Sequence, residues 1–231
     1  MTGDDRTYAR VLRIGGVCLA AAGVCYLVSS VLSLVIGPAP GATELYLKGL
    51  AGHLVASQVN FGVWVLADVL LLPAARALYV ALRPIARKAA LVGSVLLAVF
   101  GVLDLFVTEI DSLILTGIAT HYAAATTAAQ RVLLVAAAAR PLAVLPAATF
   151  FSYLISSIGL LIVSIVMLMG VFRRPTAVLG IVAAIEGLVG GLYMVVPALA
   201  VLLVPSLITF GLWALLSGWR LYQHGSAPST R

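Results

Sequence analysis

Five acidic residues lie inside long apolar stretches of this 231-residue chain: Asp68, Asp104, Glu109, Asp111 and Glu186. An ionisable side chain inside a bilayer costs several kcal/mol, so it usually faces the interior of a helix bundle or a wet cavity. At 1.5 Å per helical residue, Asp68 and Asp104 both fall about 21–24 Å from the turn that joins their helices. We therefore expect these two carboxyl groups to face each other across a helical hairpin, with Glu186 near the midplane on a neighbouring helix.

Two of the five acids fall nearer to the outer end of their helix. Glu109 and Asp111 reach the outer interface, where we expect solvated carboxylates. Asp104 and Asp111 are seven residues apart and share one helix face, so this face predicts a polar path from the exterior to Asp104. All five acids are candidate ligand-binding or proton-active residues, and hydrogen bonding between helices is the purely structural alternative.

The chemistry of these acids depends on the cations near them. No Lys or Arg is expected at the depth of Asp68 and Asp104, and we expect Arg76 to extend towards the membrane surface. A carboxyl group that lacks a counter-charge in apolar surroundings favours its neutral form. We therefore expect Asp104 to be largely protonated near neutral pH and able to donate a proton.

Other patterns that could carry chemistry are weak. His53 and His121 fall on the same side as Glu109 and Asp111, but no HxxxH or HExxH spacing is present, so we expect no metal and no cofactor. No GxSxG motif indicates a serine nucleophile. Hydroxyl groups of the first and fourth apolar segments are expected to form hydrogen bonds between helices: Ser29, Ser30, Ser33, Ser152, Tyr153, Ser156 and Ser157.

The elements that position these residues follow from composition. The chain is 63% hydrophobic and 10% charged, with a mean hydropathy of +1.16. Soluble domains carry roughly 45–50% apolar and about 25% charged residues, so an ordinary soluble domain is excluded. A membrane-spanning helix needs about 20 apolar residues. The sequence therefore predicts an all-α polytopic membrane protein.

Six apolar segments predict a single six-helix transmembrane domain over residues 1–225, with helices at about 14–36, 55–82, 89–120, 142–172, 176–196 and 198–222. The third segment is too long for a 30 Å hydrocarbon layer, so its last third must project or bend. The Ala/Thr-rich stretch 123–140 predicts an interfacial external helix between the third and fourth helices. Residues 226–231 form a polar tail that we expect to be disordered.

The basic residues predict orientation and partners. Of the 14 Lys and Arg residues, all except Lys48, Arg131 and Arg140 fall on the side that holds both termini. Cytoplasmic loops carry the excess of positive charge, so we expect a cell-membrane protein with both termini cytoplasmic. The basic residues flank apolar segments, which indicates membrane lipids as partners rather than nucleic acid. A homo-oligomer is compatible with this class.

Several short motifs resemble the prokaryotic integral-membrane family known as domain of unknown function 4386. The similarity covers about residues 10–222, and its motifs are Arg13-Ile14-Gly15-Gly16, Tyr26, Leu66-Ala67-Asp68, Ala77-Leu78-Tyr79, Leu82-Arg83-Pro84, Asp104, Arg174-Pro175, Val178-Leu179-Gly180 and Glu186. The resemblance implies a six-helix membrane protein and no established activity, substrate or cofactor. The long Ala-rich stretch 123–140 departs from it.

Two classes of function remain open. The first is a non-enzymatic protein that binds or moves a small lipophilic or protonatable molecule in an outward-facing acidic cavity. The second is an intramembrane enzyme in which Asp68, Asp104 and Glu186 serve as acid, base or cation stabiliser on a lipid or prenyl substrate. We favour the first class, because no nucleophile, metal or phosphate-binding motif stands out. An enzyme needs two carboxyl groups that converge on a closed pocket, whereas a carrier needs a continuous water path.

Overall fold

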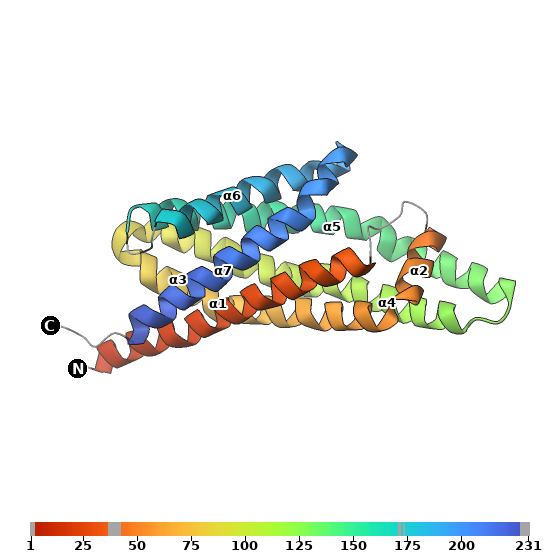
Figure 1. Cartoon of the computed structure of the whole chain (residues 1–231), viewed down its shortest axis with the longest axis horizontal. Helices are drawn as coiled ribbons and strands as arrows, with labels where there is room; N and C mark the ends of the chain where they lie inside the picture. The colour runs from red at the N-terminus through yellow and green to blue at the C-terminus, as the bar shows by residue number, and fades with distance from the viewer. Residues whose placement is uncertain (1–2, 37–42, 171, 173, 227–231) are drawn as a thin grey trace.

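The described part of the chain is an all-α bundle (Figure 1). The computed structural model describes residues 3–36, 43–170, 172 and 174–226. Its elements, in chain order, are α1 (Gly3–Ile36), α2 (Thr43–Gly52), α3 (Leu54–Leu103), η1 (Asp104–Thr108), α4 (Glu109–Ala124), α5 (Ala128–Leu168), α6 (Arg174–Gly191), η2 (Leu192–Met194), η3 (Pro197–Leu202) and α7 (Leu203–Ser226). The predicted fold class, a polytopic all-α membrane bundle, is confirmed.

The longest helical stretch is a hairpin. Residues 54–124 are continuous helix by hydrogen bonding, but Ala86 has a non-helical φ of −146° and ψ of 78°, and the chain reverses there. The two arms pack closely, because a Cβ built on Gly101 would lie 3.1 Å from the carbonyl oxygen of Asp68. Five stretches of the described chain are long and apolar enough to cross a membrane, and this hairpin is one of them, with two long arms.

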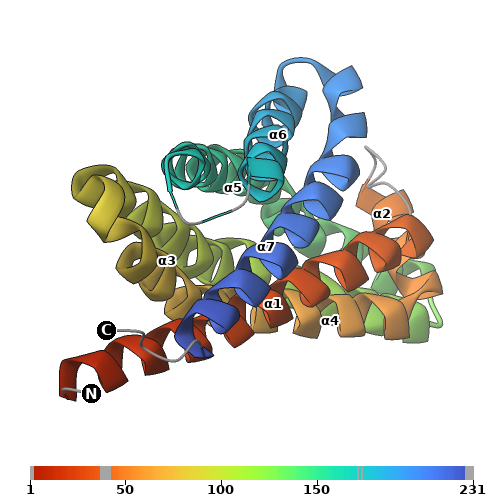
Figure 2. The same ribbon diagram turned by 60° about the vertical axis from the view of Figure 1, so that its left-hand side comes forward.

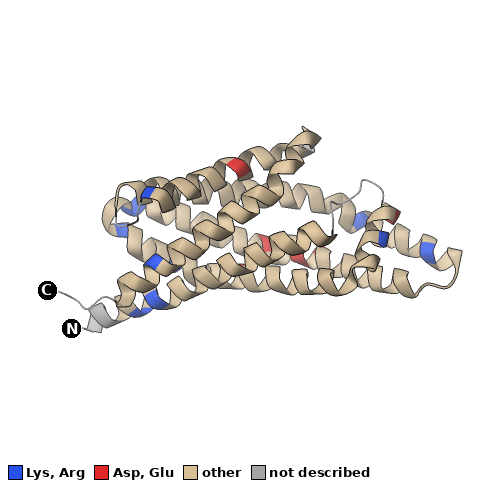
Figure 3. Ribbon diagram, in the orientation of Figure 1, with Lys and Arg blue, Asp and Glu red and all other residues tan. Residues whose placement is uncertain are grey.

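The helices close into a ring. α1 contacts α3 and α7, α3 contacts α5, α5 contacts α6, and α6 contacts α7, which returns to α1. Both termini lie at one end of the bundle in both ribbon views (Figures 1 and 2). Lys and Arg residues gather at that same end, and fewer lie at the other (Figure 3).

Glycine residues hold α1 against α7, and these two helices run antiparallel (Figure 2). A Cβ built on Gly16 would lie 2.7 Å from the carbonyl oxygen of Gly218, and one on Gly23 would lie 2.6 Å from that of Gly211. Small residues allow helix backbones to approach closely where lipid supplies no hydrophobic driving force. We call these four glycines the α1–α7 glycine contact.

The region between the third and fourth predicted spans differs from expectation. Thr127 and Gln130 form a capping box that starts α5, and the helix then continues through Pro141 and Pro146 to Leu168. The expected external helix is therefore the first part of α5 and not a separate element. Proline within a membrane helix is tolerated when neighbouring groups satisfy the freed backbone atoms, so it does not mark a helix end here.

The end of the bundle opposite both termini contains a helix that the sequence analysis did not predict. α2 packs Leu47 and Leu50 onto an apolar cluster with Leu115 and Tyr122 of α4 and Ala138 of α5. α4 and the first part of α5 extend beyond the end of α1, as the predicted excess length of the third span required (Figure 1). At the opposite end of the molecule, α7 extends to Ser226, the first residue of the predicted tail. The remainder of that tail, 227–231, lies outside the described residues.

Candidate functional site

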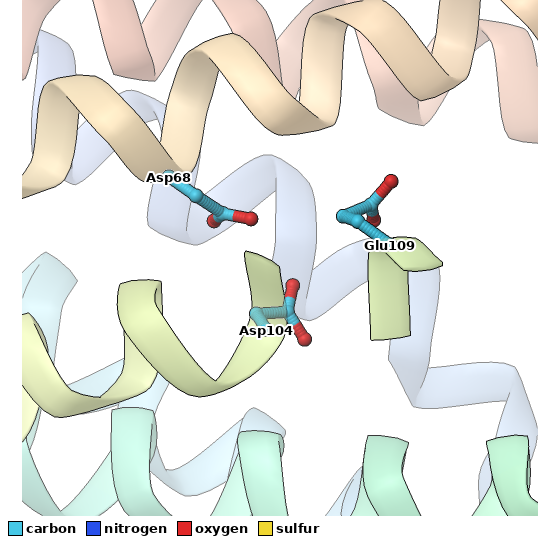
Figure 4. Close-up of side chains that lie close together, drawn as sticks. All are labelled: Asp68, Asp104 and Glu109. Carbon is cyan, nitrogen blue, oxygen red and sulfur yellow. The ribbon is translucent and has the colours of Figure 1, made fainter. Parts of the chain in front are cut away.

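Three buried carboxyl groups meet in the middle of the bundle. Asp68, Asp104 and Glu109 each offer an oxygen atom, and these three oxygens lie within 4.8 Å of one another. The side chains are 1%, 5% and 4% exposed, respectively. Asp68 lies on the first arm of the α3 hairpin, Asp104 is the first residue of η1 and Glu109 is the first residue of α4, and the three side chains lie close together (Figure 4). We call this group the carboxyl triad. The predicted proximity of Asp68 and Asp104 is confirmed.

A π-helical turn brings Glu109 into the triad. The backbone N–H of Glu109 donates to the carbonyl oxygen of Asp104, five residues earlier, across η1. In an α-helix, the side chains of residues five apart point about 140° away from each other around the helix axis. A π-turn accommodates one extra residue and reduces this angle to about 40°. The same extra residue turns Asp111 about 120° away from Asp104. The predicted shared face of Asp104 and Asp111 is therefore wrong.

The outer acids are thus placed differently from expectation. Glu109 is buried and belongs to the triad, so its predicted position as a solvated interfacial carboxylate is wrong. Asp111 is half-buried and lies outside the triad. Glu186 is half-buried on α6, also outside the triad, and its Oε2 atom is buried without a hydrogen-bond partner.

The triad has hydroxyl neighbours but few completed hydrogen bonds. Thr108 and Ser152 lie beside Asp104, and the Tyr26 hydroxyl lies beside Asp68. Both carboxylate oxygens of Asp68, Oε2 of Glu109 and the Tyr26 hydroxyl are nevertheless buried without a partner. Buried polar atoms are normally paired, so each unpaired atom calls for a physical explanation.

A cavity of about 340 Å³ adjoins the triad and receives the side chains of Asp104 and Glu109. Its polar wall is made largely of hydroxyl and amide groups from the helices around it: Ser33, Ser57, Asn60, Thr108, Ser112, Thr116, Thr149, Ser152, Ser156, Ser157 and Ser206. No Lys, Arg or His is among the described residues that line this cavity. The cavity is acidic and lacks a fixed positive charge.

Aromatic rings form a second wall of the cavity. Tyr26 of α1 makes edge contacts with Trp64 of α3 and Phe210 of α7, at centroid distances of 5.4 and 4.9 Å. All three rings line the cavity together with Phe61 and Phe100. The site therefore presents acidic oxygens beside aromatic faces, a combination that suits a molecule with one polar and one apolar end.

The sequence analysis found part of this site. Ser33, Ser152, Tyr153, Ser156 and Ser157 were expected to bond between helices, and all five also line the cavity. Ser152 lies beside Asp104 and Tyr153 beside Ser206, so these two do contact other helices as expected. The aromatic wall was missed, because Tyr26, Trp64 and Phe210 lie on three helices whose relative rotation the sequence does not reveal. The nearest available signal was the excess of Ser and Thr in otherwise apolar helices.

Potential metal ligands gather at one place among the described residues, the carboxyl triad. His53 and His121, which were weighed as ligands with Glu109 and Asp111, are exposed and do not join it. Three carboxylate oxygens and nearby hydroxyl groups are the oxygen donors that hard cations prefer.

A different acidic site lies outside the spans. Lys48 Nζ lies 2.8 Å from Glu44 Oε1 on α2, and the Tyr122 hydroxyl donates to the same oxygen at 3.3 Å. The hydrogen bond from Lys48 holds the pKa of Glu44 below its usual value of 4.5. This acid has its cation built into the protein, and we call Glu44 and Lys48 the α2 ion pair.

Searches of protein-family models, curated proteins and solved structures found no match to this chain.

Proposed function

We propose that this protein binds a small amphiphilic molecule with a protonatable group, in a cavity on the outer side of the cell membrane. The observation that carries the proposal is the cavity itself, in which two carboxyl groups with no fixed cation among the described lining residues adjoin an aromatic wall. Unpaired acids within a bilayer are expensive and mark ligand or ion sites. A volume of about 340 Å³ is at the small end of ligand pockets, which span about 300–1,000 Å³.

The experiment is a search for molecules that copurify with the protein. Wild type and Ser156→Phe are purified in parallel, and extracted small molecules are identified by mass spectrometry. Ser156 is half-buried and lines the cavity, so a phenyl ring there fills it. Ile158→Phe is the matched control, because Ile158 lies two residues away and is exposed. A molecule that is enriched on wild type and Ile158→Phe but lost from Ser156→Phe supports the proposal, and equal recovery from all three contradicts it.

The outward placement rests on the distribution of basic residues, which gather at the end with both termini. The cavity reaches the opposite end, where Tyr46 and Leu50 of α2 line it. Cysteine labelling in cells tests this orientation, with Cys18 and Cys25 first replaced by Ala. A cysteine at Thr126 should react with an impermeant reagent from outside, and one at Ser226 only after the membrane is opened. The reverse labelling pattern would show that the protein has the opposite orientation in the membrane.

An intramembrane enzyme is the second candidate. It is favoured by the convergence of Asp104 and Glu109 on one cavity beside Ser152, as acid and base groups of an active site must converge. The substrate would be a lipid or prenyl compound. Incubation of the protein with a membrane lipid extract tests this function: products formed by wild type and not by Glu109→Gln identify an enzyme, whereas unchanged extracts favour a binding protein.

Membership of the family known as domain of unknown function 4386 is also a proposal. The family has no established activity, so membership would favour neither candidate function.

A further inference from the structure

We infer that the ligand class of this cavity is a primary ammonium ion with a short apolar or aromatic tail. The ammonium group would be held by the carboxyl triad and the tail by the aromatic wall. This inference rests on the proposed function and specifies its ligand. It follows from four features of the described residues: the geometry of the triad, the unpaired hydroxyl of Tyr26, the absence of a fixed cation and the shape of the cavity.

The triad matches the donors of an ammonium group. A primary ammonium carries three N–H donors in tetrahedral directions, and each prefers an acceptor at about 2.8–2.9 Å. Three acceptors arranged in this way lie about 4.6 Å from one another. The triad oxygens lie within 4.8 Å of one another, so they can receive all three donors without a large rearrangement. Charge-assisted hydrogen bonds of this kind are roughly twice as strong as neutral ones.

Tyr26 supplies a second observation, from a polar group that is not one of the three acids. Its side chain is almost fully buried and lines the cavity, and its hydroxyl has no hydrogen-bond partner. The ring contacts Trp64 and Phe210, all three rings line the cavity, and the Tyr26 hydroxyl lies beside Asp68. A cation near such rings is attracted electrostatically by their faces. The Tyr26 hydroxyl is free to form a hydrogen bond with a polar group beside this aromatic wall.

No described residue around the triad can replace an external cation. The titratable groups that line the cavity beside the triad are Tyr26 on α1, Tyr46 on α2 and Tyr153 on α5, besides Asp104 and Glu109, and Tyr26 also lies beside Asp68. α6 and α7 contribute only uncharged residues to this lining: Ala183, Gly187, Ser206, Leu207 and Phe210. Three negative charges within 4.8 Å repel one another strongly, so protons must neutralise them when no cation is bound. A bound ammonium ion, which carries one positive charge, would displace one of these protons. Its affinity should therefore fall as the pH falls.

The shape of the cavity favours an organic cation over a bare metal ion. A metal ion would satisfy the acidic oxygens, but it would leave most of the 340 Å³ and the aromatic wall without an occupant. A quaternary ammonium has no N–H group to donate, so the triad discriminates against it. A small aromatic amine uses both walls of the cavity.

The test compares three probes on the full-length protein in lipid nanodiscs. The probes are 2-phenylethylamine, the neutral 2-phenylethanol and the quaternary N,N,N-trimethyl-2-phenylethylammonium. Isothermal titration calorimetry at pH 7.5 should give at least about tenfold tighter binding of the amine than of either other probe, because one charge-assisted hydrogen bond is worth about 1.5–3 kcal/mol. Binding of the amine should be weaker at pH 5.5 than at pH 7.5, whereas binding of the alcohol should be the same at both pH values.

The matched variants are Asp104→Asn, which should remove the preference for the amine, and Asp111→Asn, which should keep it because Asp111 lies outside the triad. If Asp104→Asn fails to fold, Glu109→Gln provides the same comparison. Infrared spectroscopy gives a second readout: the amine should remove a neutral carboxyl band from wild type.

The outcomes separate this inference from the proposed function. Equal binding of amine and alcohol would overturn the ammonium inference and leave a cavity that binds amphiphiles. If the quaternary probe binds as tightly as the amine, the proposed role of the N–H donors is overturned. Tight binding of Ca²⁺ without binding of the amine would replace the inference with a metal site. Binding of none of the organic probes, together with copurifying molecules unchanged by Ser156→Phe, would contradict both.

Discussion

The α2 ion pair and the carboxyl triad are two acidic regions that differ in whether a basic residue of the protein balances the negative charge. Glu44 lies outside the spans, is 56% exposed in its side chain and is paired with Lys48 at 2.8 Å. Asp68, Asp104 and Glu109 are buried and have no cation among the described cavity residues. A built-in cation costs little at the surface, where solvent already stabilises both charges. In the interior, where a cation would stabilise most, no cation is found among the described residues that line the cavity, and the ammonium inference assigns that role to a ligand.

A fixed cation in the triad should have the largest effect, because it makes the two regions alike. Ser152 is buried beside Asp104 and lines the cavity. In Ser152→Lys the new ammonium should pair with Asp104 and weaken binding of 2-phenylethylamine by about 100-fold or more, since a charge pair near 4 Å is worth up to about 4 kcal/mol. Calorimetric titration measures this loss. Ser152→Met is the control for added volume, and undiminished binding in a folded Ser152→Lys protein would contradict the comparison.

Removal of one acid should have the next largest effect. Asp104→Asn keeps the shape of the side chain and loses its charge, so amine affinity should fall about 10- to 100-fold, as one charged hydrogen bond is worth about 1.5–3 kcal/mol. Asp104→Leu should also leave Thr108 and Ser152 without this partner and lower the free energy of unfolding by about 1–3 kcal/mol. Titration and thermal unfolding in nanodiscs measure the two effects. An Asn variant that binds the amine as wild type does would show that Asp104 is a structural residue.

The acid on α6 should matter much less to the ligand. Glu186 lies outside the triad and is not among the residues that line the cavity. Glu186→Gln should therefore change amine affinity by less than about threefold, within the small range expected of a residue that does not touch the ligand. A loss as large as that of Asp104→Asn would extend the site to α6 and restore the wider site of the sequence analysis.

The α2 ion pair should give the smallest effect. Glu44→Gln should leave both amine binding and thermal stability near wild type at pH 7, because exposed ion pairs contribute little. The pKa of Glu44 is lowered by Lys48, so the contribution of the pair is present above pH 4.5 and is lost as the pH falls through the depressed pKa. Unfolding temperatures of wild type and Glu44→Gln should thus converge in acid. A large difference between the unfolding temperatures of the two proteins at pH 7 would show that the α2 ion pair stabilises the fold, which contradicts this prediction.

The sequence predicted the part of the site that depends on short-range geometry. Asp68 and Asp104 are equally far from the turn that contains Arg83 and Pro84, and a tight hairpin brings equal depths together. Composition alone was enough for the all-α membrane class. Both conclusions need only the helical rise and the thickness of a bilayer.

The rest of the site depends on features that helical periodicity does not encode. The π-turn at Asp104–Thr108 shifts Glu109 inward and Asp111 away, and an ordinary α-helical projection places both wrongly. α5 begins at Ala128 and continues through Pro141 and Pro146, so the expected start of this helix at about residue 142 is wrong. The meeting of Tyr26, Trp64 and Phe210 depends on how three helices are rotated against one another.

The α1–α7 glycine contact has a consequence for biosynthesis. Gly211 and Gly218 are made long after Gly16 and Gly23, because most of the printed sequence lies between the two pairs. At about 5–20 residues per second, the ribosome needs roughly 10–30 s to pass from the end of α1 to the start of α7. During that interval Gly16 and Gly23 have no α7 backbone to pack against, and the ring of helices around the cavity is not yet closed. A chain that stops before α7 therefore leaves both glycines of α1 without their packing partners.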